Sequence, residues 1–323
     1  MSRYQTLAVA TVAGTLLLVA VGSAVRTTGS GLGCPDWPLC HGQVLPPVER
    51  EAIFEWSHRT VASIVGLLII AQSAWTLVAH RADRVLGALA VAVLPLLAIQ
   101  AYLGRRAVLE ELPPSTVALH MLLALALFSA LAVMAAYAFH GPERRRIETP
   151  EYAGFRRLAA ATAVVVAGVM AIGAYSVATH AGFACLGWPD CPEGRIPFVD
   201  GGRLQHIHWL HRLSVVGGLV AVLGLAYSVR EMRNAHTWLA HATMTLAGLY
   251  VLQILVGAGN IWSDFAVTVR VAHLALGSAI LGLAVVIAVA GSYERPDTAP
   301  ANARRRRRWR PRSAAEVRRA ASG

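Results

Sequence analysis

Eight long apolar segments dominate the sequence, each containing a run of about 17 or more residues without Asp, Glu or Arg. Such a run crosses a hydrocarbon layer roughly 30 Å thick when it forms a helix that rises about 1.5 Å per residue. The segments are continuously apolar, whereas the strands of a membrane barrel alternate in polarity. They lie at residues 4–25, 58–79, 85–104, 114–139, 158–179, 209–229, 237–259 and 268–291. We therefore predict an all-α integral membrane protein with eight transmembrane helices.

The composition supports this fold class and excludes one soluble core. Hydrophobic residues make up 56% of the chain and charged residues 15%, whereas soluble domains carry about 25% charged residues. The first segment follows Ser2 and Arg3 and could be mistaken for a cleaved signal peptide. Its apolar stretch is longer than the roughly 7 to 15 residues of such signals, so we interpret it as a retained helix.

The arginines predict the orientation in the membrane, because the chain contains no lysine. Ten arginines lie in residues 1–4 and in the short connections at 80–84, 140–157 and 230–236. The alternate connections are more than twice as long in total and carry nine. Cytoplasmic loops are enriched in basic residues. We therefore expect a multi-pass plasma-membrane protein with both termini in the cytoplasm and the alternate loops on the outer face.

The sequence contains an internal repeat, in which His58 matches His211, 153 positions later. Three pairs of segments match at this offset: EWSHRTVASIVGLL at 55–68 with HWLHRLSVVGGLV at 208–220, QAYLG at 100–104 with QILVG at 253–257, and VALHMLLAL at 117–125 with RVAHLALGS at 270–278. Each copy has an even number of apolar segments, so the copies share one orientation in the membrane. We predict two four-helix bundles related by a pseudo-two-fold axis.

The repeat also predicts the domain boundaries. Residues 1–140 form the first bundle, residues 141–157 a cytoplasmic linker, and residues 158–291 the second bundle. Residues 292–323 form an Arg-rich cytoplasmic tail that we expect to be disordered. Its run RRRRRWRPR follows the last membrane helix, so attraction to anionic lipid explains it more simply than binding to nucleic acid. We therefore expect the lipid bilayer, and no nucleic acid, as a partner.

Two histidines in each copy lie near the start of predicted membrane helices. His58 and His120 are 62 residues apart, as are His211 and His273. The helices of each pair run in the same direction, so the two imidazoles lie at one depth and can hold a haem iron from both faces. The alternative is that they form interhelical hydrogen bonds. Zinc is disfavoured because two histidines per bundle fall short of its usual three or four ligands. The repeated spacing favours haem.

One cysteine pair follows the first helix of each copy. CPDWPLC contains Cys34 and Cys40, and CLGWPDC contains Cys185 and Cys191. An even number of cysteines outside the cytoplasm is typical of disulfides, so we expect Cys34–Cys40 and Cys185–Cys191 bridges. Each bridge either staples its loop or acts as an exposed, reducible pair that passes electrons to a bound group. Both interpretations stay open, with the staple favoured for the second pair.

The two copies differ at one telling position, where Glu55 in the first copy is replaced by His208 in the second. Glu55 lies three residues before His58 and hence on the same helix face. A structural interpretation is that Glu55 pairs with Arg59 or caps a helix start. A functional interpretation is that it does proton or charge chemistry at the edge of a haem bound at His58. The asymmetry favours the functional interpretation.

Taken together, these residues resemble the heme A synthase family of cytochrome oxidase assembly. The resemblance covers roughly residues 5–290. It is carried by the TGSGLGCPDWPLC loop, the ExxHR motif at Glu55, His58 and Arg59, the LHR at His211 and Arg212, and the histidines His120 and His273. The long Arg-rich tail is the one departure from the family pattern.

The resemblance implies that the C8 methyl of haem O is oxidised to the formyl of haem A by successive hydroxylations. It implies that His58 and His120 hold the haem O substrate, with Glu55 as the catalytic carboxylate. It also implies that His211 and His273 hold a resident haem b. An electron donor of unknown identity, haem O synthase and cytochrome oxidase assembly factors are further expected partners.

Arg59 and Arg212 each follow a predicted ligand by one residue. Two roles are open for them: pairing with haem propionates, or snorkelling to lipid headgroups. Two other functions also remain open for the whole chain. One is a bis-His cytochrome b that only carries electrons, and the other is a quinone-linked thiol oxidase that uses the loop cysteines.

Overall fold

The computed structural model describes residues 1–140, 146–191, 198–199, 201–232, 237–291 and 293. Its helices are α1 (Arg3–Thr27), α2 (Arg50–Ala79), α3 (Arg84–Leu109), α4 (Pro114–His140), α5 (Pro150–Ala178), the short 3₁₀ helix η1 (Ala181–Phe183), α6 (Arg203–Glu231), α7 (Thr237–Trp262) and α8 (Val267–Ala290). The α-helices are all long and apolar enough to cross a membrane. The prediction of an all-α, multi-pass membrane protein is therefore confirmed.

Three helices begin well before the apolar segments that predicted them. The starts lie at Arg50 for α2, Pro150 for α5 and Arg203 for α6, whereas the predicted starts were residues 58, 158 and 209. Charged residues at these ends were interpreted as loop, but they favour helices when the helix projects beyond the apolar layer. Glu55 and His58 consequently lie inside α2 and not at its start.

The start of α5 shows the local signals that extend these helices. The Thr149 hydroxyl accepts a hydrogen bond from the backbone N–H of Tyr152 at 3.3 Å, and Pro150 occupies the first helical position. Both features stabilise a helix N-terminus. The predicted linker at 141–157 therefore includes the first turns of α5, and residues 141–145 lie outside the described part of the chain.

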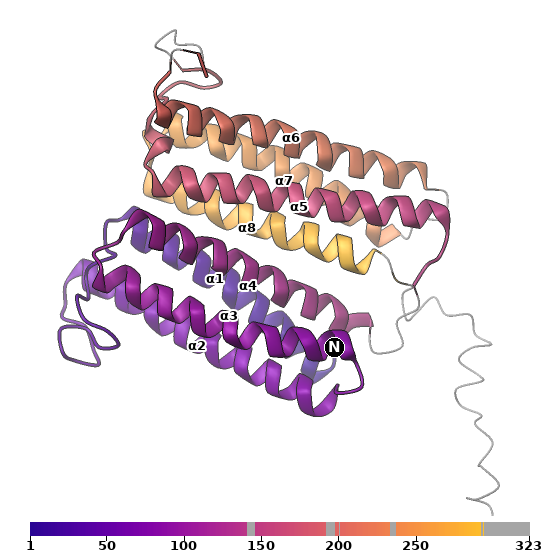
Figure 1. Cartoon of the computed structure of the whole chain (residues 1–323), viewed down its shortest axis with the longest axis horizontal. Helices are drawn as coiled ribbons and strands as arrows, with labels where there is room; N and C mark the ends of the chain where they lie inside the picture. Colours follow the sequence, from indigo (N-terminus) through magenta and orange to yellow (C-terminus); the bar gives the residue numbers. More distant parts are fainter. Residues whose placement is uncertain (141–145, 192–197, 200, 233–236, 292, 294–323) are drawn as a thin grey trace, which may run out of the picture.

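The helices lie in two sets, α1–α4 and α5–α8, which are side by side (Figure 1). Within the first set α1 packs against α2 and α4, and α3 packs against α2 and α4; the corresponding pairs of the second set also pack together. The sets meet where α8 contacts α1 and α4, and where α4 contacts α5. The loop after α1 and the loop after α5 lie at the same end of the molecule (Figure 1). The pseudo-two-fold relationship between the sets stays a prediction.

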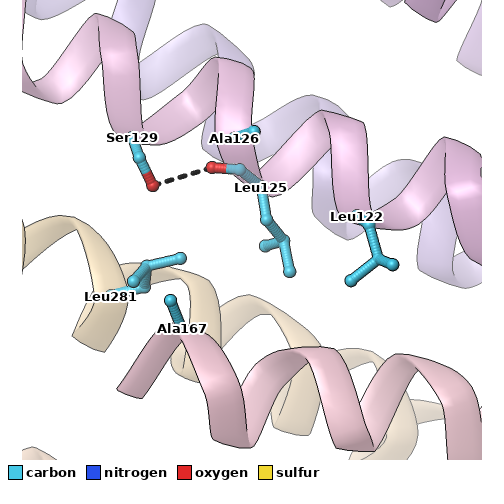
Figure 2. Close-up of a pocket in the computed structure, with 6 residues that line it drawn as sticks. All are labelled: Leu122, Leu125, Ala126, Ser129, Ala167 and Leu281. Carbon is cyan, nitrogen blue, oxygen red and sulfur yellow. Dashed lines mark hydrogen bonds between the residues drawn. The ribbon is translucent and has the colours of Figure 1, made fainter. Parts of the chain in front are cut away.

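Each set of helices has its own apolar core. In the first set the fully buried side chains include Ile69, Leu86, Leu131 and Met134, and in the second set they include Leu225, Leu239, Leu246 and Ile287. An apolar crevice of about 200 Å³ lies where α4 meets α5 and α8, lined by Leu122, Leu125, Ala126, Ser129, Ala167 and Leu281 (Figure 2). The one hydroxyl in this lining, that of Ser129, donates to the Leu125 carbonyl at 2.8 Å. The crevice therefore offers no reactive group.

The buried faces of α2 and α6 differ in polarity, although the two helices match in the repeat. The α2 residues Gln72, Ser73 and Thr76 are buried. The residues 153 positions later on α6 are also buried, but they are apolar: Leu225, Ala226 and Val229. The Thr76 hydroxyl shares a 2.7 Å hydrogen bond with the hydroxyl of Tyr4 on α1. Neither polar atom of the Gln72 amide has a hydrogen-bond partner in the described chain. The first set thus contains a buried polar layer that the second set replaces with apolar side chains.

We expect Gln72→Leu to stabilise the protein in detergent by about 1–3 kcal/mol, because a buried polar group without a partner destabilises by roughly that amount. Leucine is the residue that α6 places at the matching position, Leu225. The reciprocal variant Leu225→Gln is expected to be destabilising. Thermal unfolding followed by tryptophan fluorescence measures both. A lower Tm for Gln72→Leu would mean that the amide makes a stabilising contact, contrary to this account.

Candidate functional site

The loop after α1 folds against α2 around its disulfide. Cys34 and Cys40 are bridged, with their Cα atoms 4.6 Å apart, and both are buried against Ala52 and Trp56. At Gly33 a Cβ atom would overlap the backbone of α2, so only glycine allows the loop to approach this closely. The predicted Cys34–Cys40 bridge is present, but its sulfurs are buried and not exposed.

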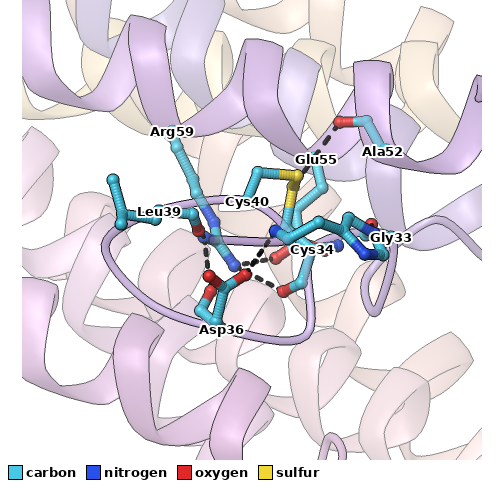
Figure 3. Close-up of polar contacts among 9 residues, drawn as sticks. Gly33, Cys34, Asp36, Leu39, Cys40, Ala52, Glu55 and Arg59 are labelled. Carbon is cyan, nitrogen blue, oxygen red and sulfur yellow. Dashed lines mark hydrogen bonds and ion pairs between the residues drawn. A yellow bond between two sulfur atoms is a disulfide. The ribbon is translucent and has the colours of Figure 1, made fainter. Parts of the chain in front are cut away.

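Glu55 and Arg59 hold this loop to α2 (Figure 3). One carboxylate oxygen of Glu55 accepts the backbone N–H of Cys34 at 2.9 Å, and the other accepts the Arg59 guanidinium at 2.6 Å. Arg59 also donates to the carbonyls of Asp36, Leu39 and Cys34 at 2.7 to 2.8 Å. Glu55 is only 3% exposed. Each carboxylate oxygen therefore accepts a hydrogen bond, which holds Glu55 in one position beside the disulfide.

Asp36 shapes the turn of the same loop. Its carboxylate accepts the backbone N–H groups of Gly42 and His41, both at 2.7 Å. The hydrogen bond from Gly42, aided by that from His41, lowers the pKa of Asp36 below its ordinary value. Because these bonds are made to the ionised form, they persist as the pH falls until it passes this lowered pKa.

The loop after α5 repeats the arrangement with fewer bonds. Cys185 and Cys191 form the second predicted disulfide. Arg212 donates to the carbonyls of Gly187 and Pro189 at 2.7 and 2.8 Å, as Arg59 does in the first loop. The indole N–H of Trp209 points to the Cys191 sulfur at 3.2 Å, and that of the matching Trp56 donates to the Val44 carbonyl at 2.8 Å.

Both arginines thus direct their guanidinium groups to loop carbonyls. The acceptor carbonyls lie 20 to 27 residues before their arginine in sequence, because each loop folds back onto its helix. Charge-assisted bonds to backbone oxygens explain both residues without a ligand. Pairing with haem propionates stays a prediction, and in this structure the loops already use these donors.

Each of the four predicted ligand histidines packs its ring against a glycine of the preceding helix. The contacts are made by Gly22 to His58, Gly104 to His120, Gly173 to His211, and Gly257 to His273. A Cβ atom built on these glycines would lie 2.8, 3.2, 3.0 and 3.1 Å from the ring Cε1 atom, in that order. A larger residue would push each imidazole away. The same contact therefore recurs four times, in the helix pairs α1/α2, α3/α4, α5/α6 and α7/α8.

Two of the four imidazoles make the interhelical contacts of the structural interpretation, His120 with Gln100 and His273 with Gln253. The rings are also compatible with a haem. The Nδ1 atoms of His58, His120 and His211 are buried and have no hydrogen-bond partner in the described chain. His58 lies within range of a direct charge interaction with His120, and His273 with His211. Buried imidazoles in a membrane protein are usually paired with a partner, and a haem iron is a partner that two facing imidazoles can share. These observations support iron ligation by the two histidine pairs.

Two sets of site residues were not predicted from the sequence as parts of the site. The four glycines are one set, and the other is Gln100 and Gln253, whose amides contact His120 and His273. Their signal was present, because QAYLG and QILVG match at the offset of the histidines. It could have been interpreted as a site signal, since glutamine and glycine four residues apart share one helix face.

The fold and the site together define a class: a multi-pass helical membrane protein with two pairs of buried histidines and two disulfide-bridged loops at the same end. Comparison with known proteins is more specific. A model of the family described as "Cytochrome oxidase assembly protein" matches residues 5–285. The chain belongs to this family.

Several relatives are heme A synthases. The protein of that name from Exiguobacterium sp. strain AT1b is 30% identical over 84% of this chain and 87% of its own length. The one from Symbiobacterium thermophilum is 31% identical over 80% of this chain and 85% of its own. The one from Shewanella oneidensis is 26% identical over 84% and 91%. The resemblance to the heme A synthase family is therefore confirmed.

Replacing a contacting glycine tests whether these imidazole positions matter for binding. In Gly173→Ala the new Cβ would lie 3.0 Å from the His211 ring, so the ring must move. We expect about 10-fold or greater loss of haem affinity, as for other changes that misplace a metal ligand. Gly168→Ala, on the same helix, has no atom within 4 Å of its new Cβ and serves as the control. Equal haem content in the two purified variants, measured by pyridine hemochrome absorbance, would contradict the predicted role of His211.

Proposed function

We propose that this protein is a heme A synthase that oxidises the C8 methyl group of haem O to the formyl group of haem A by successive hydroxylations. Family membership and the heme A synthase relatives support the general activity. The observation that carries the assignment of the site is an asymmetry. Two matching histidine pairs are present, but only the first has a buried carboxylate, each oxygen of which accepts a hydrogen bond, three residues before a ligand, Glu55 before His58.

In this proposal residues 1–140 hold the haem O substrate and residues 158–291 hold a resident haem b. His58 and His120 bind the substrate iron, and His211 and His273 bind haem b. When bound, haem b supplies one-electron transfer. The second set of helices has His208 at the position of Glu55, so it lacks a carboxylate there and suits a group that is held but not modified.

Glu55 is the proposed catalytic residue. The Cys34 N–H and the Arg59 guanidinium hold its two oxygens, so its negative charge has a fixed position before the substrate arrives. A preorganised charge stabilises positive charge that develops on the C8 carbon, and a carboxylate can also carry the protons that oxidation moves. The disulfide loop thus has a positioning role toward Glu55. Arg59 and Arg212 fix the loops, with propionate pairing as a secondary role.

The proposed topology places the protein in the plasma membrane with both termini in the cytoplasm and the cysteine loops on the outer face. The density of arginines in the short loops supports this orientation. A haem b held by His211 and His273 would supply electron transfer between an outer donor and the first set of helices. The donor is of unknown identity, and haem O synthase and cytochrome oxidase assembly factors are proposed partners in supplying haem O and receiving haem A.

Two other functions are less well supported. A thiol oxidase must exchange disulfides with a client protein, but Cys34, Cys40, Cys185 and Cys191 are each at most 8% exposed. Attack on a disulfide requires access to a sulfur atom. A bis-His cytochrome b that only carries electrons would explain the four histidines. It gives no reason for a buried carboxylate beside one pair alone.

Glu55→Gln tests the catalytic assignment. The amide keeps the size of the side chain but removes its charge, so we expect haem A formation to fall by about 10²- to 10⁴-fold, the usual range for loss of a group that moves protons. Both haem sites should still fill. The measurement is the ratio of haem A to haem O extracted from cells that produce the variant.

The matched control is Glu110→Gln. Glu110 also pairs with an arginine four residues before it, Arg106, at 2.6 Å, but this pair is exposed at the C-terminal end of α3. An exposed pair of this kind contributes little to stability, so haem A formation should be retained. Normal accumulation of haem A in Glu55→Gln would mean that Glu55 is not the catalytic group.

A further inference from the structure

Two glutamines occupy matching positions beside the second histidine of each pair. Gln100 on α3 lies four residues before Gly104, and Gln253 on α7 lies four residues before Gly257. Each glutamine therefore shares a helix face with the glycine that contacts the same imidazole. The amide oxygens of both glutamines are buried and have no hydrogen-bond partner in the described chain.

The two glutamines contact different nitrogens of their histidines. The Gln100 amide nitrogen lies 3.3 Å from Nε2 of His120. The Gln253 amide nitrogen lies 3.2 Å from Nδ1 of His273 and also donates to the backbone carbonyl of His273 at 2.8 Å. The matching glutamines of the repeat thus contact different ring nitrogens, Nε2 in His120 and Nδ1 in His273.

The ring nitrogen available to an iron atom is Nε2 in both cases. The Cε1 atom of each ring lies 3.1 to 3.2 Å from the Cβ position of its glycine, and Nδ1 lies at 3.7 Å, so this edge faces the neighbouring helix. Nε2 is bonded to Cε1 but lies more than 4 Å from the same Cβ position in both rings. A histidine that binds a metal through one nitrogen is oriented by a hydrogen bond at the other.

Gln253 therefore contacts His273 in the manner of an orienting residue. Its amide contacts Nδ1 and makes no contact with Nε2. When Nε2 binds iron, the proton of the neutral ring is on Nδ1, so the amide must turn its oxygen, which has no partner in the described chain, to accept from Nδ1–H. The bond from the amide nitrogen to the His273 carbonyl keeps Gln253 next to this ring. Gln100 instead occupies the nitrogen that iron needs.

We propose that Gln100 competes with the substrate iron for Nε2 of His120, so that His120 is the axial ligand the first haem site can release, whereas Gln253 positions His273 as a permanent ligand of the second site. This inference rests on the proposed function. It assigns a purpose to the difference between the sites, because a substrate must enter and a product must leave, whereas a resident haem stays. His120 is then the ligand whose release would leave a coordination position of the substrate iron open.

The test measures haem release from the full-length protein loaded with both haems. Purified protein is mixed with excess haem-free myoglobin as the acceptor, and pyridine hemochrome spectra distinguish haem b from haem O and haem A. Removing one neutral hydrogen bond changes an equilibrium by roughly 2- to 10-fold. We expect Gln100→Leu to slow release of haem O and haem A by about this factor, and Gln253→Leu to speed release of haem b by about the same factor.

A second readout separates competition from general packing. Release of His120 leaves a five-coordinate, high-spin iron, so the electron paramagnetic resonance spectrum of the first haem should lose high-spin signal in Gln100→Leu. Gln100→Met, which also lacks the amide but keeps a long flexible side chain, should behave in the same way. Each variant acts as the control for the other site, because Gln100 variants should leave haem b release unchanged.

Faster or unchanged release of haem O and haem A in both Gln100 variants would overturn the proposal. A merely structural glutamine would give faster release, since its loss would loosen the site. Wild-type protein that contains haem b but no haem O or haem A under any loading condition would overturn the proposed function as well. The two failures are thus distinguishable.

Discussion

An imidazole buried between apolar helices requires room on the preceding helix, and a glycine provides this room at every predicted ligand. Gly22, Gly104, Gly173 and Gly257 each allow a histidine ring to lie at van der Waals distance from their helix. The glycines fix how close α1 lies to α2, α3 to α4, α5 to α6, and α7 to α8. The depth and direction of the four imidazoles, and hence both proposed haem sites, depend on these contacts.

The disulfide loops form a second layer built on the same helices. Within the EWSHR segment of α2, Glu55, Trp56 and Arg59 form hydrogen bonds to the first loop. His58 in the same segment contacts Gly22. The loop and the proposed ligand are thus joined through one helical turn. In the second set, Trp209 and Arg212 hold the loop, but His208 replaces the carboxylate. The scaffold is repeated, and the proposed chemistry is confined to one copy.

Much of this arrangement could be predicted from the sequence, because apolar length and the 62-residue spacing of the histidines are properties of the chain itself. The starts of α2, α5 and α6 were predicted too late, since charged residues that extend a helix beyond the membrane have no apolar signal. The loop contacts of Arg59 and Arg212 could not be predicted either. They depend on how irregular loops fold back over 20 or more residues, and neither periodicity nor spacing specifies that path.

The most direct test of this account is the identity of the haems that the protein binds. Two histidine pairs at matching positions of the repeat, one beside Glu55 and one beside His208, should hold two chemically different haems. Haems extracted from the purified full-length protein, identified by mass and by pyridine hemochrome spectra, should comprise haem b together with haem O or haem A, in about equal amounts. Haem b alone at two per chain, or no haem at all, would contradict the account.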